Sequence, residues 1–156
     1  MKPMNGRNIF TILAWPAAAA LLAVAGCANT GSSMSGPVGP DKVIYHVNDT
    51  GAQATNAIRN VGNHLEVNPK AKIVIVTHAL GVDFLMNGSK DKNGNPYHVA
   101  VEQLKNQGVS FQVCEITLRN RKLTKDQFIP EVSYVPSGVA EIARLQQREG
   151  YAYLRP

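Results

Sequence analysis

AKIVIVT, residues 71–77, is an uninterrupted aliphatic run near the middle of the 156-residue chain. Such a run is typical of a β-strand that is covered on both faces, rather than one that turns a polar face to water. Strands of this kind lie inside parallel sheets that carry helices on both sides. The run therefore predicts an α/β fold, and the segments on either side of it should alternate between strand and helix.

Four other segments are rich in β-branched, aliphatic or aromatic residues and predict strands: KVIYHV (42–47), VSFQV (109–113), EVSYV (131–135) and, at a sheet edge, YAYL (151–154). Helices are expected between them: from a capping box at Thr50 and Gln53 to about 65, over 97–106, from Cys114 to about 122 and from Ser137 to Glu149, with Gly150 as a left-handed stop. This alternation implies right-handed crossovers and a mostly parallel five-stranded sheet flanked by helices.

Polar and reactive side chains follow four of the predicted strands. In order along the chain they are Asn48 and Asp49, His78, Cys114 and Ser137. Ligands of open α/β sheets bind outside the carboxyl ends of the strands, so these side chains are expected on one rim. Ser137 is most simply a helix cap, and Asn48 and Asp49 can be turn residues. His78 can be an acid or base, or a histidine bonded to a backbone carbonyl.

Cys114 has two interpretations. Free cysteine is among the most buried residue types, so Cys114 can be a small core residue. It also opens a predicted helix, where unpaired amides and the helix dipole would stabilise a thiolate and lower its pKa. The predicted domain, 42–156, holds no other cysteine. An internal disulfide and a two-cysteine oxidoreductase mechanism are therefore excluded there.

The N-terminal segment is typical of an exported lipoprotein. A short positive region precedes the apolar stretch 9–25, and Val24-Ala25-Gly26-Cys27 resembles the bacterial lipobox, whose cysteine is diacylated. The alternative is an ordinary cleaved signal peptide with a chance cysteine. We expect a lipoprotein signal peptide over 1–26 and lipidation at Cys27. The Gly-, Ser- and Pro-rich residues 27–41 would form a lipid-anchored flexible tether.

These features predict a periplasmic protein anchored in the membrane through its lipid. Ala28 is not the aspartate that commonly retains lipoproteins in the inner membrane, which favours the outer membrane. Removal of 1–26 takes away two positive charges and lowers the formal net charge from +5 to +3. The basic residues are scattered, so no nucleic-acid partner is expected.

Three kinds of ligand site are not expected. In the loop 87–96, Asp91, Asn93 and Asn95 fit the start of a calcium loop, but Pro96 stands where glycine is required. His46, His64 and His98 form no zinc motif. NDTGAQ, after the first strand, has too few glycines to bind phosphate. No metal and no cofactor is therefore expected.

Three longer segments carry a resemblance to a known family: VTHALGVDFL, GVSFQVCEITL and YVPSGVAEIARLQQREGYAYLRP. They resemble the DsrE/DsrF-like (YchN-like) family over 42–156, and the N-terminus makes this a lipoprotein-type member. The resemblance implies a flavodoxin-like layered α/β fold and homo-oligomers, often trimers or hexamers. The family's sulfur-oxidation members carry sulfur as a persulfide on the cysteine that matches Cys114, and His78 matches the histidine beside it. The sequence departs from the family at Ala79, where glycine is expected.

Two functions remain open. The chain is expected to be a sulfur-relay protein that carries sulfane sulfur on Cys114 between donor and acceptor proteins. The alternative is a non-catalytic oligomeric periplasmic binding lipoprotein in which Cys114 only packs in the core. Whether the protein is an enzyme stays undecided.

Overall fold

The computed structural model describes residues 39–156. The predicted signal peptide, the lipidation site Cys27 and the tether up to residue 38 lie outside the described residues. Within 39–156, no helix is both long and apolar enough to cross a membrane. Asp41, expected to end the tether, is already bonded to the folded domain, because its carbonyl oxygen accepts the Lys72 amide at 2.6 Å.

Five parallel strands form one sheet in the order β4-β3-β2-β1-β5. Their bounds are β1 Lys42–Asp49, β2 Lys72–Leu80, β3 Ser110–Cys114, β4 Val132–Val135 and β5 Ala152–Leu154. The predicted α/β fold, with its mostly parallel five-stranded sheet, is confirmed, and β5 lies at an edge as expected. Within residues 39–156, the sheet begins with β1 and continues outward through β2 and β3 to β4, and β5 then pairs with the free side of β1.

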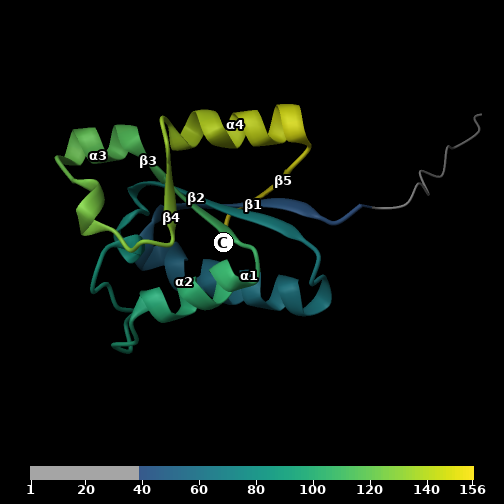
Figure 1. Cartoon of the computed structure of the whole chain (residues 1–156), viewed down its shortest axis with the longest axis horizontal. Helices are drawn as coiled ribbons and strands as arrows, with labels where there is room; N and C mark the ends of the chain where they lie inside the picture. Colours follow the sequence, from purple (N-terminus) through teal and green to yellow (C-terminus); the bar gives the residue numbers. More distant parts are fainter. Residues whose placement is uncertain (1–38) are drawn as a thin grey trace, which may run out of the picture. The chain divides into compact units, whose positions relative to one another are not determined.

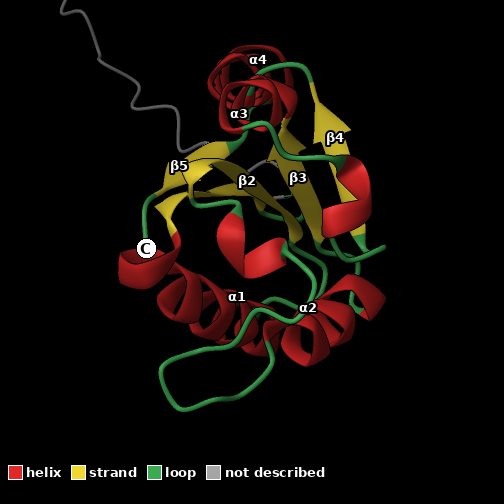
Figure 2. Cartoon of the chain, turned by 90° about the vertical axis from the view of Figure 1, so that its left-hand side faces the viewer, coloured by secondary structure: helices red, strands yellow, loops and turns green. Residues whose placement is uncertain are grey.

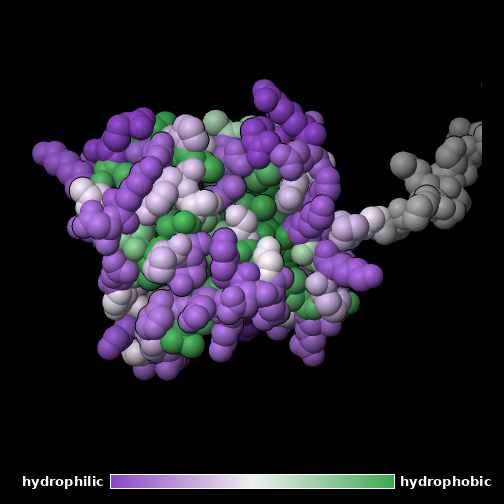
Figure 3. All heavy atoms as spheres, viewed as in Figure 1, coloured by the Kyte–Doolittle hydropathy of each residue, from purple (hydrophilic) through white to green (hydrophobic). Residues whose placement is uncertain are grey.

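Helices cover both faces of the sheet, which gives the layered architecture expected of a flavodoxin-like fold. Helices α1 (Thr55–Val67) and α2 (Tyr97–Asn106) lie on one face, and α3 (Glu115–Arg121) and α4 (Gly138–Glu149) lie on the other (Figures 1 and 2). In Figure 3, hydrophilic side chains cover much of the helices at the top and bottom, and hydrophobic ones are visible mainly in the band between them.

Alternation along each strand divides the core in two. Val43, Tyr45 and Val47 of β1 pack in the larger cluster on the α1 and α2 face. Ile44 packs in a smaller cluster on the α4 face, with Val74, Val76, Ile142 and Leu145. His46, His78 and Cys114 alternate with residues of the larger cluster, so the pleat directs them towards the α4 face. The smaller core therefore leaves room for polar groups at the carboxyl ends of the strands.

The first helix begins differently from the sequence prediction. A π-helical turn, Thr50–Ala54, precedes α1. Asp49 is the N-cap, because its Oδ1 accepts the Ala52 amide at 3.0 Å. Gln53 Oε1 accepts the Asn48 amide at 2.9 Å and the Asp49 amide at 3.0 Å. The predicted capping box at Thr50 and Gln53 is therefore wrong, and Asp49 takes the role assigned to Thr50.

Thr50 instead fastens the end of β2. Its hydroxyl donates to the Leu80 carbonyl at 2.8 Å and accepts the Phe84 amide at 3.1 Å. Strand β2 runs three residues beyond its predicted end at Thr77. Gly81 then passes close to β1, where a Cβ would lie 2.1 Å from the Val47 carbonyl oxygen. Glycine is therefore required at this position, since the opposing atoms are backbone.

Candidate functional site

A depression of about 350 Å³ lies at the carboxyl ends of β2 and β3, beside the starts of α3 and α4. It is lined by His78, Ala79, Cys114, Ile116, Thr117, Asn120, Arg121, Ser137 and Val139. Three of the five rim residues expected from the sequence, His78, Cys114 and Ser137, therefore come together. They do so because the β2 and β3 ends are neighbours and α4 starts directly over them.

Cys114 is the last residue of β3 and the N-cap residue of α3. It is only 3% exposed. Burial raises the pKa of its thiol, but the nearby amides of Gly138, Thr117 and Ile116 and the Thr117 hydroxyl lower the pKa by more, so it lies below its usual value. Cys114 nevertheless makes no side-chain cap hydrogen bond to α3. The surroundings thus favour a thiolate although the residue is buried.

Thr117 is placed to donate to that sulfur. Its Oγ1 accepts the Ala79 amide at 2.9 Å, so the hydroxyl proton remains available for Cys114. Ala79 adopts a left-handed conformation with φ 51°, which explains why glycine is expected there. Its carbonyl oxygen accepts a bond from Arg121 at 3.0 Å. The end of β2 therefore orients the Thr117 hydroxyl beside the thiol.

Gly138 brings a second helix start to Cys114. A Cβ at this position would lie 3.1 Å from the Thr77 carbonyl oxygen, 3.3 Å from Cys114 Cβ and 3.4 Å from His78 Cβ. These contacts would be tighter than ordinary Cβ contacts, so the missing side chain of Gly138 lets the start of α4 lie close to Cys114. Ser137 caps the same helix, because its Oγ accepts the Ala140 amide at 3.3 Å. The sequence predicted the cap but not the convergence of α3 and α4.

His78 extends from β2 towards His46 rather than towards Cys114. The two Nε2 atoms lie 2.7 Å apart, and the rings stack with their centroids 4.7 Å apart. His46 Nδ1 lies 2.7 Å from the Tyr153 hydroxyl. Within residues 39–156, no hydrogen bond joins His78 to Cys114. Sequence reasoning missed His46, although its period-two spacing from Ile44 placed it on the α4 face.

Burial lowers the pKa values of both histidines. For His46, burial, the nearby His78 and the positive Arg155 lower the pKa to about 4. For His78, burial lowers the pKa below its usual value. Both rings are therefore neutral at pH 7, and one of the two facing nitrogens carries the shared proton. Which one carries it depends on the tautomers.

Asn48 and Asp49, the other two expected rim residues, lie at the end of β1 and do not line the depression. Strand β2 separates β1 from β3 in the sheet, so these side chains cannot reach Cys114. Asp49 is a helix cap, and Asn48 Oδ1 lies 3.5 Å from the Arg155 guanidinium. Their contacts are those of turn and end-of-strand residues.

Arg121 places a positive charge at the edge of the depression. Its guanidinium bonds Asp83 Oδ1 at 2.6 Å as well as the Ala79 carbonyl oxygen. Two exposed apolar side chains, Ile116 and Val139, line the depression at the starts of α3 and α4. The surroundings of Cys114 therefore combine an apolar rim with a guanidinium that is already paired with Asp83, which suits a small sulfur species.

The loop before α2 is organised by Asp91. Its Oδ1 accepts the amides of Asn93 and Asn95, both at 2.8 Å, and its Oδ2 accepts the Asn95 side chain at 3.0 Å. These bonds lower the pKa of the Asp91 carboxyl.

Across residues 39–156, no group of three or more His, Cys, Asp or Glu side chains is arranged to hold a metal ion.

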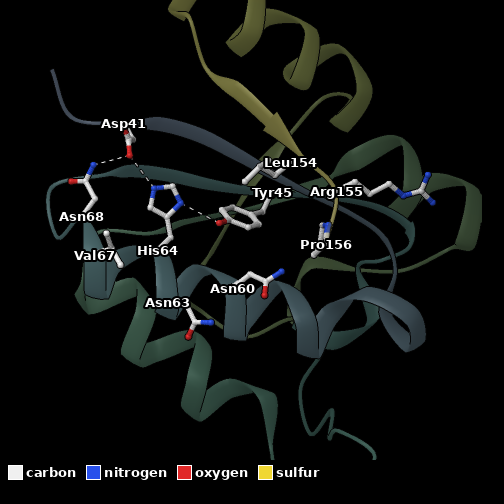
Figure 4. A pocket seen from close by; sticks show the side chains of 10 residues that line it. All are labelled: Asp41, Tyr45, Asn60, Asn63, His64, Val67, Asn68, Leu154, Arg155 and Pro156. Atoms are coloured by element: carbon white, nitrogen blue, oxygen red, sulfur yellow. Dashed lines mark hydrogen bonds and ion pairs between the residues drawn. The ribbon is translucent and has the colours of Figure 1, made fainter. Parts of the chain in front are cut away.

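A second cavity, of about 500 Å³, lies between α1 and the end of β5 (Figure 4). His64 bridges Tyr45 and Asp41 there, with Nδ1 3.1 Å from the Tyr45 hydroxyl and Nε2 3.2 Å from Asp41 Oδ2. Asn68 donates to the same carboxylate at 2.7 Å. These bonds fix the start of the domain to α1, and the cavity holds no nucleophile comparable to Cys114.

Comparison with known proteins agrees with this architecture. The model of the DsrE/DsrF-like family matches residues 42–156. The structure of a protein of unknown function from Methanobacterium thermoautotrophicum is similar, with 32% sequence identity and a TM-score of 0.67 over 74% of this chain and 99% of that one. The ychN protein of E. coli is similar in fold, with 16% identity and a TM-score of 0.60 over 75% and 98% of the two chains. No curated protein matches.

Proposed function

The chain belongs to the DsrE/DsrF-like family, and we propose that it is a sulfur carrier that holds sulfane sulfur as a persulfide on Cys114. The family is associated with sulfur relay. The observation that carries the proposal is the position of Cys114, which lines a depression where the starts of α3 and α4 meet. The amides at these helix starts lower the pKa of its thiol.

The transfer needs no oxidant or reductant. The Cys114 thiolate attacks the outer sulfur of a donor persulfide, R–S–SH. A new sulfur–sulfur bond forms to Cys114, and the donor bond breaks. The donor leaves as the thiolate R–S⁻ with the electron pair of that bond. The amides around Cys114 stabilise the attacking anion.

His78 is the acid or base for sulfur groups inside the depression. Because amides and the Thr117 hydroxyl already stabilise the thiolate, the group that most needs a proton is the leaving thiolate. His78 lines the depression, and its neutral ring can supply that proton from one nitrogen only while it takes up another proton at the other nitrogen. A second thiol would take the sulfur in the reverse of the same step.

The proposal includes the cell context expected from the sequence. The chain would act as a lipoprotein, anchored through Cys27 at the periplasmic face of the outer membrane. It would assemble as a homo-oligomer, a trimer or hexamer, and exchange sulfur with donor and acceptor proteins. The second candidate function is a non-catalytic binding lipoprotein, and the 3% exposure of Cys114 favours it.

Intact-mass measurement distinguishes the two functions. The full chain carrying Cys27→Ser, held in detergent, has Cys114 as its one thiol. It is exposed to polysulfide and then to a thiol reductant, beside the same chain carrying Cys114→Ala. A sulfur adduct that the reductant removes and that Cys114→Ala lacks supports the carrier. Absence of an adduct, with a thiol that resists alkylation until unfolding, favours the binding module.

A further inference from the structure

Three side chains from three neighbouring strands form a continuous hydrogen-bonded chain beside the Cys114 depression. Tyr153 of β5 bonds His46 Nδ1, and His46 Nε2 bonds His78 Nε2, each at 2.7 Å. The outer end is open to water, since Tyr153 is 39% exposed. The inner end is His78, which lines the depression. This row of hydrogen-bonded side chains therefore connects solvent at the sheet edge with the Cys114 depression.

The position of this chain follows from the strand order. Strand β5 returns to the free side of β1, so β5, β1 and β2 are consecutive in the sheet. Tyr153 pairs in register with Ile44, and His46 pairs with Val76. In-register residues of parallel strands share a face, so all three polar side chains point to the α4 face.

We propose that Tyr153 and His46 form a proton relay that supplies His78 during sulfur transfer at Cys114. The inference rests on the proposed function and extends it to two residues that do not touch the sulfur. His46 and Tyr153 are positioning residues, because they act through His78.

The relay balances protons without charging a ring. In one arrangement Tyr153 donates to His46 Nδ1, His46 donates from Nε2 to His78, and the His78 proton sits on Nδ1. When His78 gives that proton to the leaving thiolate, it takes the His46 proton at Nε2. His46 then takes the Tyr153 proton at Nδ1, and the phenol oxygen takes one from a buffer acid in the solvent, which leaves as its conjugate base. Tyr153 ends unchanged, and both rings end neutral in their other tautomers.

The electrostatics of the cluster require such a neutral route. The low pKa of His46, about 4, arises from burial, His78 and Arg155, and burial lowers the pKa of His78. An imidazolium at either position is therefore costly at neutral pH. On α4, which covers this face, Glu141 is engaged by Arg144 at 2.7 Å.

The test measures how fast cysteine persulfide loads sulfur onto Cys114. The full chain carrying Cys27→Ser is compared with the same chain carrying His46→Gln or Tyr153→Phe. A glutamine side chain can keep a hydrogen bond to His78, but it cannot release a proton from one atom while it takes up a proton at another. Because the relay acts through His78, we expect a loss of about tenfold for His46→Gln, below the 10²–10⁴ of a direct acid or base. For Tyr153→Phe we expect the rate of sulfur loading to fall by about three- to tenfold, with the final sulfur content unchanged.

Two matched controls and a rescue complete the design. The controls are His98→Gln and Tyr151→Phe, and both should load sulfur at the parent rate. His98 lies on the exposed side of α2, and the Tyr151 hydroxyl makes no hydrogen bond within residues 39–156. Added imidazole buffer should restore the rate of His46→Gln, because it protonates the leaving thiolate directly. A purely structural loss would not respond to imidazole.

The outcomes separate two failures. If the parent chain loads sulfur and both relay variants match its rate, or stay slow in imidazole, the relay is overturned and the carrier function stands. If the parent chain loads no sulfur, the carrier function fails first and the relay falls with it. The Tyr153→Phe variant still tests the relay if His46→Gln folds poorly, because Tyr153 is partly exposed at the sheet edge.

Discussion

Replacing Gly138 by alanine would test whether the start of α4 activates Cys114. The added Cβ would meet the Thr77 carbonyl oxygen at 3.1 Å, Cys114 Cβ at 3.3 Å and His78 Cβ at 3.4 Å. All three atoms are backbone or Cβ, so none can rotate away. The helix start must therefore move back by a few tenths of an ångström, and the amide of residue 138 moves with it.

The expected magnitudes follow from two opposing effects. Overpacking costs about 1–3 kcal/mol, and replacing a helical glycine returns about 0.5–1 kcal/mol, so the free energy of unfolding should fall by about 1 kcal/mol. A hydrogen bond to a charged group contributes about 1.5 kcal/mol, roughly tenfold in the thiol–thiolate equilibrium. A more basic thiolate is also more nucleophilic, which returns part of the rate. Alkylation of Cys114 at neutral pH should slow by about three- to tenfold.

The assay is iodoacetamide alkylation followed by intact mass from pH 5 to 10, on the full chain carrying Cys27→Ser. Gly138→Ala should shift the alkylation midpoint to higher pH. Gly62→Ala in α1 is the matched control, because its Cβ would have nothing within 4 Å. It should stabilise the fold by about 1 kcal/mol and leave alkylation unchanged. An unchanged rate and midpoint in Gly138→Ala would refute the idea that α4 activates the thiol.

Three further predictions concern stability. Gly81→Ala should destabilise the protein by about 3 kcal/mol or more in urea unfolding, because its Cβ would lie 2.1 Å from the Val47 carbonyl oxygen, and a loss below 1 kcal/mol would contradict this contact. The pKa of Cys114 is lowered from 9.0 in the folded protein, so the unfolded chain binds more protons at this thiol as the pH approaches 9. The free energy of unfolding, relative to that of Cys114→Ala, should therefore rise with pH until about 9. A difference in free energy that does not change with pH would show that the fold does not favour the thiolate. The pKa of His46 falls from 6.5 to about 4, so acid below pH 6.5 should cost the parent protein stability that His46→Gln retains. Partial exposure limits that loss to about 1–2 kcal/mol, and parallel acid unfolding curves would count against it.

The sequence determined the order and type of the elements, because local pattern is enough for them. The aliphatic run AKIVIVT predicted a doubly covered strand, and β2 is flanked by β1 and β3 with helices on both faces. Ser137 and Gly150 marked the ends of α4 through capping chemistry that depends only on neighbouring backbone. The rim at the strand ends followed from the parallel topology, and it held for His78, Cys114 and Ser137.

Tertiary structure decided which of those side chains meet, because contacts across strands depend on strand order and register. The order β4-β3-β2-β1-β5 excludes Asn48 and Asp49 from the depression and brings Tyr153 to His46. Spacing along the chain contains no trace of that contact, since the two residues are 107 positions apart. The sequence by itself determined that a cysteine stands at a helix start. Only the packing of α4, through the missing side chain of Gly138, added the second helix start whose amide reaches the thiol.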